Sequence, residues 1–293
     1  LEYNNNGLCL TDEVMFLRYF FWGFFCAIFM VSSIMLLYMY WMVRPIQGVH
    51  RRSDGNKIEL TWREAELLFT EFVSKKTYNC EVVEAVGSTT KSHAEGVHLT
   101  CMDQKYQPKA QCIVYSFGIA NIWHFEDAFA RRGCQVFAFD PSMKTESHKR
   151  MDNLWFYNIG LGKVDSDNFT PRVDKYVDKS QIFTWKLRTM KSIMEMLGHT
   201  NKTIDVLKMD IEGYEFDVIS SMIDDGTIEH VRQFIGEWHI FGDQKYDYPT
   251  KYSIAKRLWN FGFKTFNAGV HPRCKNRYCF QVDLGFVNTK LGK

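Results

Sequence analysis

The chain has 293 residues, of which 46% are hydrophobic and 24% charged, with 6 prolines and 19 glycines. This composition excludes a disordered, collagen-like or low-complexity chain, because it holds enough apolar material to offset the entropy of ordering. The net charge of +2 gives no reason to expect a nucleic-acid partner, since such proteins usually concentrate basic charge. The length allows one large domain or two small ones.

Residues 19–43 form a run of 25 residues without a charged side chain. As a helix the run is about 37 Å long, enough to cross a hydrocarbon core of about 30 Å with some tilt. Trp22 lies near one end and Trp41 near the other, where interfacial aromatic belts form. The alternatives are a buried core helix and a signal peptide, but the run has no polar stripe and no cleavage pattern follows Val43. We predict a single transmembrane helix that contacts the lipid bilayer.

The cues to membrane orientation conflict. The basic residues that follow the span would place the larger, C-terminal part in the cytosol; they are Arg44, Arg51, Arg52 and Lys57. Seven cysteines outside the span and the glycosylation sequon Asn201-Lys-Thr favour the opposite side. A second sequon, Asn168-Phe-Thr, is followed by Pro171, which disfavours its modification. Buried thiols and a chance sequon would explain the same residues, so the residues themselves leave the orientation open.

The chain divides by composition into four parts: a flank at residues 1–18, the anchor at 19–43, a stem with a leading helix at 44–77, and a globular domain at 78–293. The leading helix is predicted over Glu64–Lys75 from its apolar spacing. Residues 76–110 are polar and irregular. Cys80 and Cys101 bracket much of that stretch and could form a disulfide if the domain lies in an oxidising compartment.

From residue 111 onward, predicted strands alternate with predicted helices. Strands are expected at 112–118, 135–140, 154–159, 204–211, 231–240, 263–270 and 278–287. Helices are expected at 123–132, 182–197, 214–223 and 253–261. Strands separated by crossover helices indicate an α/β fold, with a mainly parallel sheet and helices on both faces.

Such sheets bind ligands beyond the carboxyl ends of their strands. That rule places the site at five segments: Ser116–Asn121, Asp140–Ser142, Asn158–Gly160, Asp210–Gly213 and Glu237–His239. The first segment offers small residues, such as Gly118, where a backbone can approach a ligand closely. Asp140 follows Gly118 by 22 residues, a spacing at which a carboxylate accepts hydrogen bonds from a ribose diol. This pair by itself describes any nucleoside site.

The two common nucleoside cofactors make different demands on the first loop. A nicotinamide dinucleotide needs three glycines, the third for close helix–strand packing, and Trp123 stands at that third position. S-adenosylmethionine carries no phosphate and does not need the third glycine. The sequence therefore favours S-adenosylmethionine as the cofactor.

Four strings then resemble a known family: VYSFGIAN, VFAFDPS, DVLKMDIEGYEFDVI and FIGEWH, in this order over residues 78–289. They are similar to the class I methyltransferase domain shared by FkbM-like enzymes and the methyltransferase-like protein 24 group. The resemblance implies a seven-stranded Rossmann-like sheet whose last hairpin inserts an antiparallel strand. It also implies methyl transfer from S-adenosylmethionine to an oxygen of an acceptor, a hydroxyl or a carboxyl. Members are typically membrane-anchored or secreted, which favours a lumenal (Golgi or ER) or extracellular domain.

The first loop departs from the family pattern, because Ala120 replaces a small glycine and no acid precedes the loop. In the implied site, Gly118 and its neighbours pass the methionine portion, Asp140 binds the ribose hydroxyls, and Asp210 faces the transferable methyl. The predicted cofactor-binding residues are Ser116, Phe117, Gly118, Ala120, Asn121, Asp140, Pro141, Ser142, Asn158, Gly160 and Asp210.

An alcohol acceptor needs a base, because its proton is held too tightly at neutral pH. Asp210 and His239 are the candidate bases, and Glu212 and Glu237 are candidates to orient them or the acceptor. His239 could equally be a structural histidine at a strand end. Hard oxygens and an imidazole would also suit Mn²⁺ or Mg²⁺, but we assign no metal ligand from the sequence.

Other polar residues of the motif have simpler interpretations. Glu215 stands in the first turn of a predicted helix, where a carboxylate offsets the helix dipole. Lys208 lies inside an apolar strand and is expected to pair with a carboxylate. Cys274 and Cys279 have no second pair at a zinc-site spacing, so a disulfide or free thiols are expected there.

The alternative function is a catalytically inactive binding or scaffold protein with the methyltransferase fold, tethered to a membrane. The altered first loop permits it. The presence of Asp140, Asp210 and Glu212 together favours an enzyme, because the fold itself does not demand all three.

Overall fold

The structure is a computed structural model that describes residues 60–87, 96–173, 184–270 and 280–292. The chain divides into two compact units, Leu1–Ile58 and Glu59–Lys293, and the description below concerns the second. The transmembrane helix predicted at residues 19–43 lies outside the described residues. Among the residues that are described, no helix is both long and apolar enough to cross a membrane.

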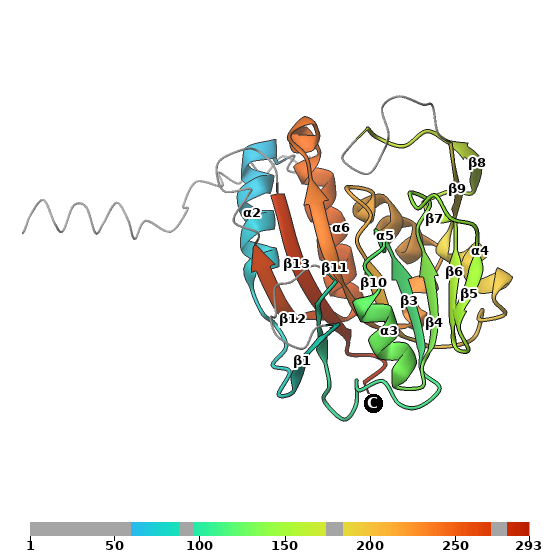
Figure 1. Cartoon of the computed structure of the whole chain (residues 1–293). Helices are drawn as coiled ribbons and strands as arrows, with labels where there is room; N and C mark the ends of the chain where they lie inside the picture. The colour runs from blue at the N-terminus through green and yellow to red at the C-terminus, as the bar shows by residue number, and fades with distance from the viewer. Residues whose placement is uncertain (1–59, 88–95, 174–183, 271–279, 293) are drawn as a thin grey trace, which may run out of the picture. The chain divides into compact units, whose positions relative to one another are not determined.

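An eight-stranded sheet forms the centre of the domain, in the order β12-β13-β11-β10-β3-β4-β6-β5 (Figure 1). The strands are β3 (Ile113–Phe117), β4 (Gln135–Phe139), β5 (His148–Met151), β6 (Leu154–Tyr157), β10 (Ile204–Met209), β11 (Val231–Ile240), β12 (Phe263–Val270) and β13 (Phe280–Asn288). The five strands from β6 to β11 are parallel, and β13 lies antiparallel between β11 and β12. This confirms the predicted mostly parallel sheet with its inserted antiparallel strand. The edge strand β5, antiparallel to β6, was not predicted.

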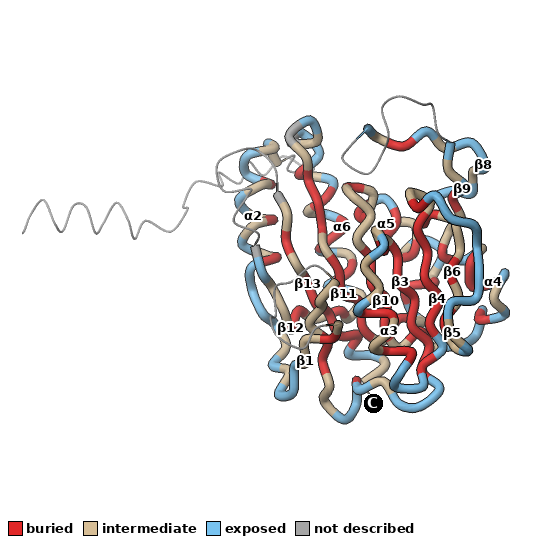
Figure 2. Tube along the Cα trace, viewed as in Figure 1, coloured by how far each residue is buried: buried red, intermediate tan, exposed pale blue. Residues whose placement is uncertain are grey.

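Two apolar layers cover the sheet, and its central strands are coloured as mostly buried in Figure 2. One layer contains the helices α2 (Trp62–Ser74), α4 (Met190–Met196), α5 (Glu215–Asp224) and α6 (Tyr248–Phe261). The other contains α3 (His124–Arg131) and a two-stranded antiparallel sheet of β1 (Val83–Val86) and β2 (His98–Cys101). Alternate strand residues supply the two layers: Tyr115 packs into the first and Val114 into the second, as the two-residue period of a strand requires.

Helix α2 belongs to this unit although the sequence groups it with the stem. A capping box starts the helix: the Thr61 amide donates to Glu64 Oε2 (2.9 Å) and the Glu64 amide donates to Thr61 Oγ1 (3.3 Å). Its apolar face is fully buried in the main core through Ala65, Phe69 and Val73. Because that face completes the core, the folded unit begins near Glu59.

A second small sheet was not predicted and follows β6. It contains β7 (Gly160–Leu161), β9 (Trp185–Arg188) and β8 (Ser166–Phe169), in that order. The helix predicted over 182–197 was therefore too long, since its described part begins only at Met190 after Thr189 caps the Ser192 amide (3.1 Å). The preceding residues pair with β7 instead, with Leu187 opposite Gly160. That pairing depends on a chain segment far away in sequence, which helical periodicity does not detect.

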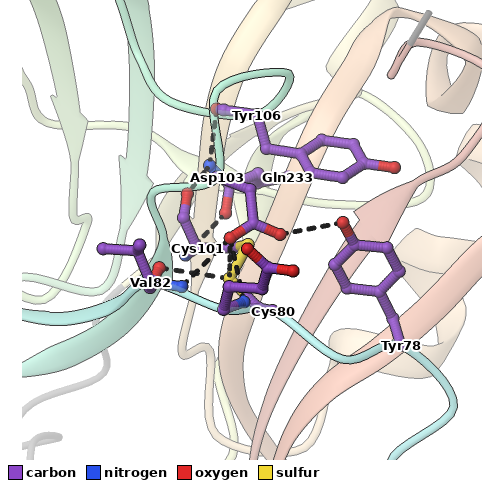
Figure 3. Close-up of a disulfide and its surroundings, with 8 residues drawn as sticks. Tyr78, Cys80, Val82, Cys101, Asp103, Tyr106 and Gln233 are labelled. Carbon is purple, nitrogen blue, oxygen red and sulfur yellow. Dashed lines mark hydrogen bonds between the residues drawn. A yellow bond between two sulfur atoms is a disulfide. The ribbon is translucent and has the colours of Figure 1, made fainter.

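A disulfide and a carboxylate hold together the described parts of the stretch 76–110, on either side of residues 88–95 (Figure 3). Cys80 and Cys101 form the predicted disulfide. Beside it, Asp103 accepts hydrogen bonds from the Val82 amide (3.0 Å) and the Tyr78 hydroxyl (2.9 Å). Gln233 of β11 donates to the Cys101 carbonyl and accepts from the Cys101 amide, both at 3.0 Å. These bonds fix the β1–β2 sheet to the central sheet.

A second disulfide, Cys112–Cys134, was not predicted. Its cysteines immediately precede the adjacent parallel strands β3 and β4, whose register pairs Ile113 with Gln135. The Cys112–Cys134 disulfide lies at the end of the central sheet where β3 and β4 begin. The Cys80–Cys101 disulfide lies on the β1–β2 sheet, since Cys101 is the last residue of β2. Cys274 and Cys279 lie outside the described residues.

Candidate functional site

A cavity of about 380 Å³ opens at the carboxyl ends of β3, β4 and β10. The sheet, the β7–β9 insertion and the start of α5 form its walls. The predicted residues that line it are Phe117, Gly118, Ala120, Asp140, Pro141, Ser142, Gly160, Asp210 and Glu212. The carboxyl-end rule therefore located the cavity.

Gly118 is where the chains of β3 and β10 come closest. Its φ of +79° lies in the left-handed region, and a Cβ atom there would be 1.9 Å from the Asp210 carbonyl oxygen. The Gly118 amide donates to the Phe139 carbonyl (3.0 Å), which ties the same loop to β4. Only glycine meets both the conformational and the spatial requirement, so the backbone itself forms this part of the cavity wall.

Asp140 organises the first loop. Its Oδ2 accepts hydrogen bonds from the amides of Ile119 and Ala120, both at 2.8 Å, and its Oδ1 accepts from the amide (2.8 Å) and hydroxyl (2.6 Å) of Ser142. Ala120, at the position where the family has a glycine, has a φ of +48°. The Asp140 carboxylate thus stabilises an alanine in a conformation that side chains disfavour.

Three of the predicted cofactor residues do not line the cavity. Ser116 is fully buried and donates its hydroxyl to Glu126 Oε1 of α3 (2.6 Å). The Asn158 side chain donates to the carbonyls of Met143 (3.3 Å) and Thr145 (2.8 Å) and so fixes the turn after β4. Asn121 is exposed beyond the loop. Successive side chains of a strand point to opposite faces of the sheet. Phe117 therefore lines the cavity, whereas the preceding Ser116 points to the other face.

Lys208 supports the first loop from inside the sheet. It is buried in β10, and its Nζ donates to the Gly118 carbonyl. Its charge also acts on Glu126, where burial raises the pKa and Lys208 and Ser116 only partly offset that effect. Lys208 was predicted to pair with a carboxylate. Its hydrogen bond is instead to the Gly118 carbonyl, and it acts on the Glu126 carboxylate through its charge.

The far wall of the cavity is apolar and aromatic. Phe117 and Phe139 stack with ring centroids 4.6 Å apart, and Phe139 stacks on Tyr157 at 5.3 Å. The insertion and α5 add further lining residues, namely Leu161, Phe169, Trp185, Leu187, Tyr214 and Val218. An apolar wall beside a carboxylate and exposed backbone groups suits a ligand with one flat apolar part and one polar part.

A group of carboxylates surrounds one histidine at the carboxyl ends of β10 and β11. Glu215, the first residue of α5, is fully buried, and its Oε1 accepts from the Gly213 amide (3.1 Å) and lies 3.0 Å from His239 Nδ1. The other ring nitrogen, His239 Nε2, is 3.3 Å from Glu237 Oε1 and 3.9 Å from Glu212 Oε2. The structure thus brings together all four predicted catalytic positions, since Asp210 is close enough to affect the His239 charge.

The electrostatics separate the two candidate bases. Burial alone lowers the pKa of His239, but Glu215, Glu237 and Asp210 together raise it well above its usual value of 6.5. The ring is therefore an imidazolium at neutral pH and has no free nitrogen to accept a proton. Burial raises the pKa of Asp210 to about 6, against the opposing charges of Lys208 and His239. Asp210 is thus ionised at neutral pH and remains basic enough to accept a proton.

Sequence reasoning missed Asp283 and underestimated Glu215. Asp283 of β13 is paired in register with Glu237, and burial, Glu237 and Asp210 raise its pKa to about 7. The sequence offered one sign of it: Asp283 is the single charged residue of its strand. Glu215 does occupy the first turn of a helix, as predicted, but its buried carboxylate also joins the loop after β10 to His239.

Ligand atoms of Asp210, Glu212 and His239 lie within 4.8 Å of one another, an arrangement that a divalent cation could enter. His239 Nδ1 lies 3.0 Å from Glu215 Oε1, and we assign no metal ligand.

The chain matches a family of methyltransferase domains over residues 41–288. It belongs to that family. The human protein "Probable methyltransferase-like protein 24" is 27% identical over 223 residues, which are 72% of this chain and 57% of the human protein. The rat protein of the same name is 28% identical over 182 residues, 58% of this chain and 47% of the rat protein. The chain spans about half the length of these curated relatives.

These matches confirm the sequence-based assignment to class I S-adenosylmethionine-dependent methyltransferases of the methyltransferase-like protein 24 group. Among solved structures, a Streptococcus pneumoniae protein in complex with S-adenosyl-L-methionine shares 9% identity. The likeness covers 63% of this chain and 70% of that one, with a TM-score of 0.31. A score this low adds nothing to the family assignment.

The Gly118→Ala variant should lose ligand binding at the cavity. A left-handed conformation costs an alanine about 1–2 kcal/mol, and at Gly118 the added Cβ also overlaps the Asp210 carbonyl. Gly133→Ala is the matched control, because Gly133 has a similar φ of +84° and a Cβ added there would have no neighbouring atom within 4 Å. Urea unfolding and S-adenosylmethionine titration of both variants measure the difference. Equal stability losses in the two variants would show that the close approach does not matter.

The Asp283→Asn variant should change how stability depends on pH. The pKa of Asp283 is about 7 in the folded protein and about 3.9 when unfolded, so the folded state binds the proton more tightly. Its contribution to stability is present at low pH and is lost as the pH rises from about 4 to 7. The variant should therefore lose less melting temperature between pH 5 and pH 8 than the wild type. An equal change of melting temperature between pH 5 and pH 8 in the variant and the wild type would contradict a raised pKa of Asp283.

Proposed function

We propose that the domain binds S-adenosylmethionine in the cavity and transfers its methyl group to a hydroxyl or carboxyl oxygen of an acceptor. One observation supports this most directly. In a member of a methyltransferase domain family, the Gly118 backbone, the Asp140 carboxylate and Asp210 line one cavity at the carboxyl ends of three adjacent parallel strands. That is where open parallel sheets bind nucleoside ligands.

The lining residues suggest how the cofactor lies. The bare backbone of Gly118 leaves room for the methionine portion, and Asp140 is the acceptor for the ribose hydroxyls. Of the donors that Asp140 now engages, the Ser142 hydroxyl is the one that a ribose hydroxyl can replace without unfolding the loop. The adenine would pack between Pro141 and the apolar wall near Gly160.

Methyl transfer to a hydroxyl oxygen requires alignment and removal of one proton, whereas a carboxylate acceptor is already ionised at neutral pH and requires alignment alone. The acceptor oxygen attacks the methyl carbon, the carbon–sulfur bond breaks, and S-adenosylhomocysteine leaves as a neutral thioether. Much of the rate comes from holding the two reactants in line. Asp210, at the end of β10 on the cavity wall, would take the proton of the acceptor. The His239 imidazolium and its glutamates would orient the acceptor and Asp210.

We further propose that residues 19–43 anchor the protein in a membrane and that the domain is lumenal or extracellular. The two disulfides support this side, because disulfides persist in oxidising compartments and are rare in the cytosol. The basic residues after the anchor favour the cytosolic side, but the positive-inside rule is a statistical preference of membrane proteins. We give more weight to the two disulfides, because they contribute directly to the stability of the fold. The acceptor is unassigned, and we expect no nucleic-acid partner.

Titration of S-adenosylmethionine into the purified protein tests the cofactor site. The wild type should bind, and Asp140→Ala should bind at least tenfold more weakly, since it loses the ribose acceptor and the loop contacts. Ser142→Ala is the control that removes one donor to Asp140 and leaves both loop amides in place. If the folded wild-type protein gives no binding signal, the inactive scaffold with a methyltransferase fold becomes the better interpretation.

The pH dependence of methyl transfer tests the base. With labelled S-adenosylmethionine and an acceptor found by screening, kcat/KM should rise as the pH increases through about 6, because Asp210 must be ionised to accept a proton. Asp210→Asn should reduce kcat at least a hundredfold and leave cofactor affinity within a few-fold. An Asp210→Asn enzyme that keeps wild-type kcat would eliminate Asp210 as the base.

A further inference from the structure

The sequon Asn201-Lys202-Thr203 lies in the turn between α4 and β10. Asn201 and Lys202 are exposed, and Thr203 is half-buried. Within the residues that the structure describes, the Asn201 side chain makes no hydrogen bond. A bulky group on its Nδ2 would therefore displace no interaction of the fold.

The turn has a defined conformation because its first residue is anchored in the core. His199 is buried, its Nδ1 lies 2.8 Å from the Tyr115 hydroxyl, and its amide donates to the Met194 carbonyl (2.7 Å). The Lys202 amide then donates to the His199 carbonyl (2.9 Å) and closes the turn. Asn201 is an exposed central residue of a closed, anchored turn.

This turn is at the opposite end of the sheet from the cavity. β10 begins at Ile204, directly after the sequon, and its other end leads to Asp210 on the cavity wall. The 6 residues of β10, at about 3.3 Å each, separate the two ends by about 20 Å. A glycan on Asn201 would leave the cavity open.

The second sequon lies in a different setting. Asn168 is within β8, and its neighbour Phe169 lines the cavity and packs edge-to-face on Tyr214 at 5.5 Å. A glycan there would sit at the cavity rim, and Pro171 directly follows its threonine. Position and sequence both favour Asn201 over Asn168.

We propose that Asn201 is an N-glycosylation site of this protein. The proposal rests on the lumenal or extracellular placement proposed above, which the two disulfides support. In the reaction, a bond forms between Asn201 Nδ2 and C1 of the first sugar of a lipid-linked oligosaccharide diphosphate. The bond between C1 and the diphosphate oxygen breaks, the lipid diphosphate leaves, and the amide nitrogen loses one proton to a base.

The test is the electrophoretic mobility of the full chain, expressed in mammalian cells, before and after digestion with a peptide N-glycosidase. The wild type should show one shift on digestion, and Asn201→Gln and Thr203→Val should show none. Thr203→Ser should keep the shift because it retains the hydroxyl of the sequon, and Asn168→Gln should keep it as well. A wild-type chain that is not shifted, or a shift that only Asn168→Gln abolishes, would overturn the proposal.

Cofactor titration of the same proteins separates this inference from the proposed function. Asn201→Gln should bind S-adenosylmethionine with the wild-type Kd, since the turn is far from the cavity. A wild type that carries the glycan but binds no cofactor would remove the proposed activity and leave the modification site intact. A wild type that binds the cofactor, forms both disulfides and carries no glycan would remove the modification site alone.

Discussion

The contact between the loop after β3 and the end of β10 determines the shape of the site. Gly118 approaches the Asp210 carbonyl so closely that no side chain fits between them, and Lys208 and Asp140 fix the loop from two sides. Both side chains bind backbone atoms of the loop, so the shape of this part of the cavity is set by hydrogen bonds within the protein. The same contact aligns Asp210 with the cavity, which couples cofactor binding to the proposed chemistry.

Charge is distributed unevenly around this contact. Lys208 is a buried cation on the loop side, whereas five carboxylates and His239 gather near the carboxyl ends of β10 and β11. These carboxylates belong to Asp210, Glu212, Glu215, Glu237 and Asp283. The histidine is charged because the glutamates surround it, and the carboxyl pKa values of Asp210 and Asp283 rise because the group is buried. An active site that transfers one proton benefits from a carboxylate whose pKa lies near the working pH.

The two ends of the central sheet differ in what they carry. The covalent links and the proposed glycan lie where strands such as β3 and β10 begin, and the cavity lies where they end. Stabilising groups can thus be added at one end without obstructing ligand entry at the other. The anchored small sheet of β1 and β2, joined to β11 through Gln233, follows the same arrangement.

The sequence by itself determined the order of the parallel strands and the strand-end segments of the site, because strand periodicity and the glycine and acid at strand ends are local features. It also identified Asp210 as the residue facing the cavity. Only the tertiary structure decided which way side chains turn: Ser116 toward α3, Asn158 toward a turn, and Glu215 toward His239. It also revealed Asp283 and the sheet of β7, β8 and β9, since both depend on pairing between distant segments. The protonation state of His239 was also decided only by the tertiary structure, because the glutamates that raise its pKa come together only in the folded chain.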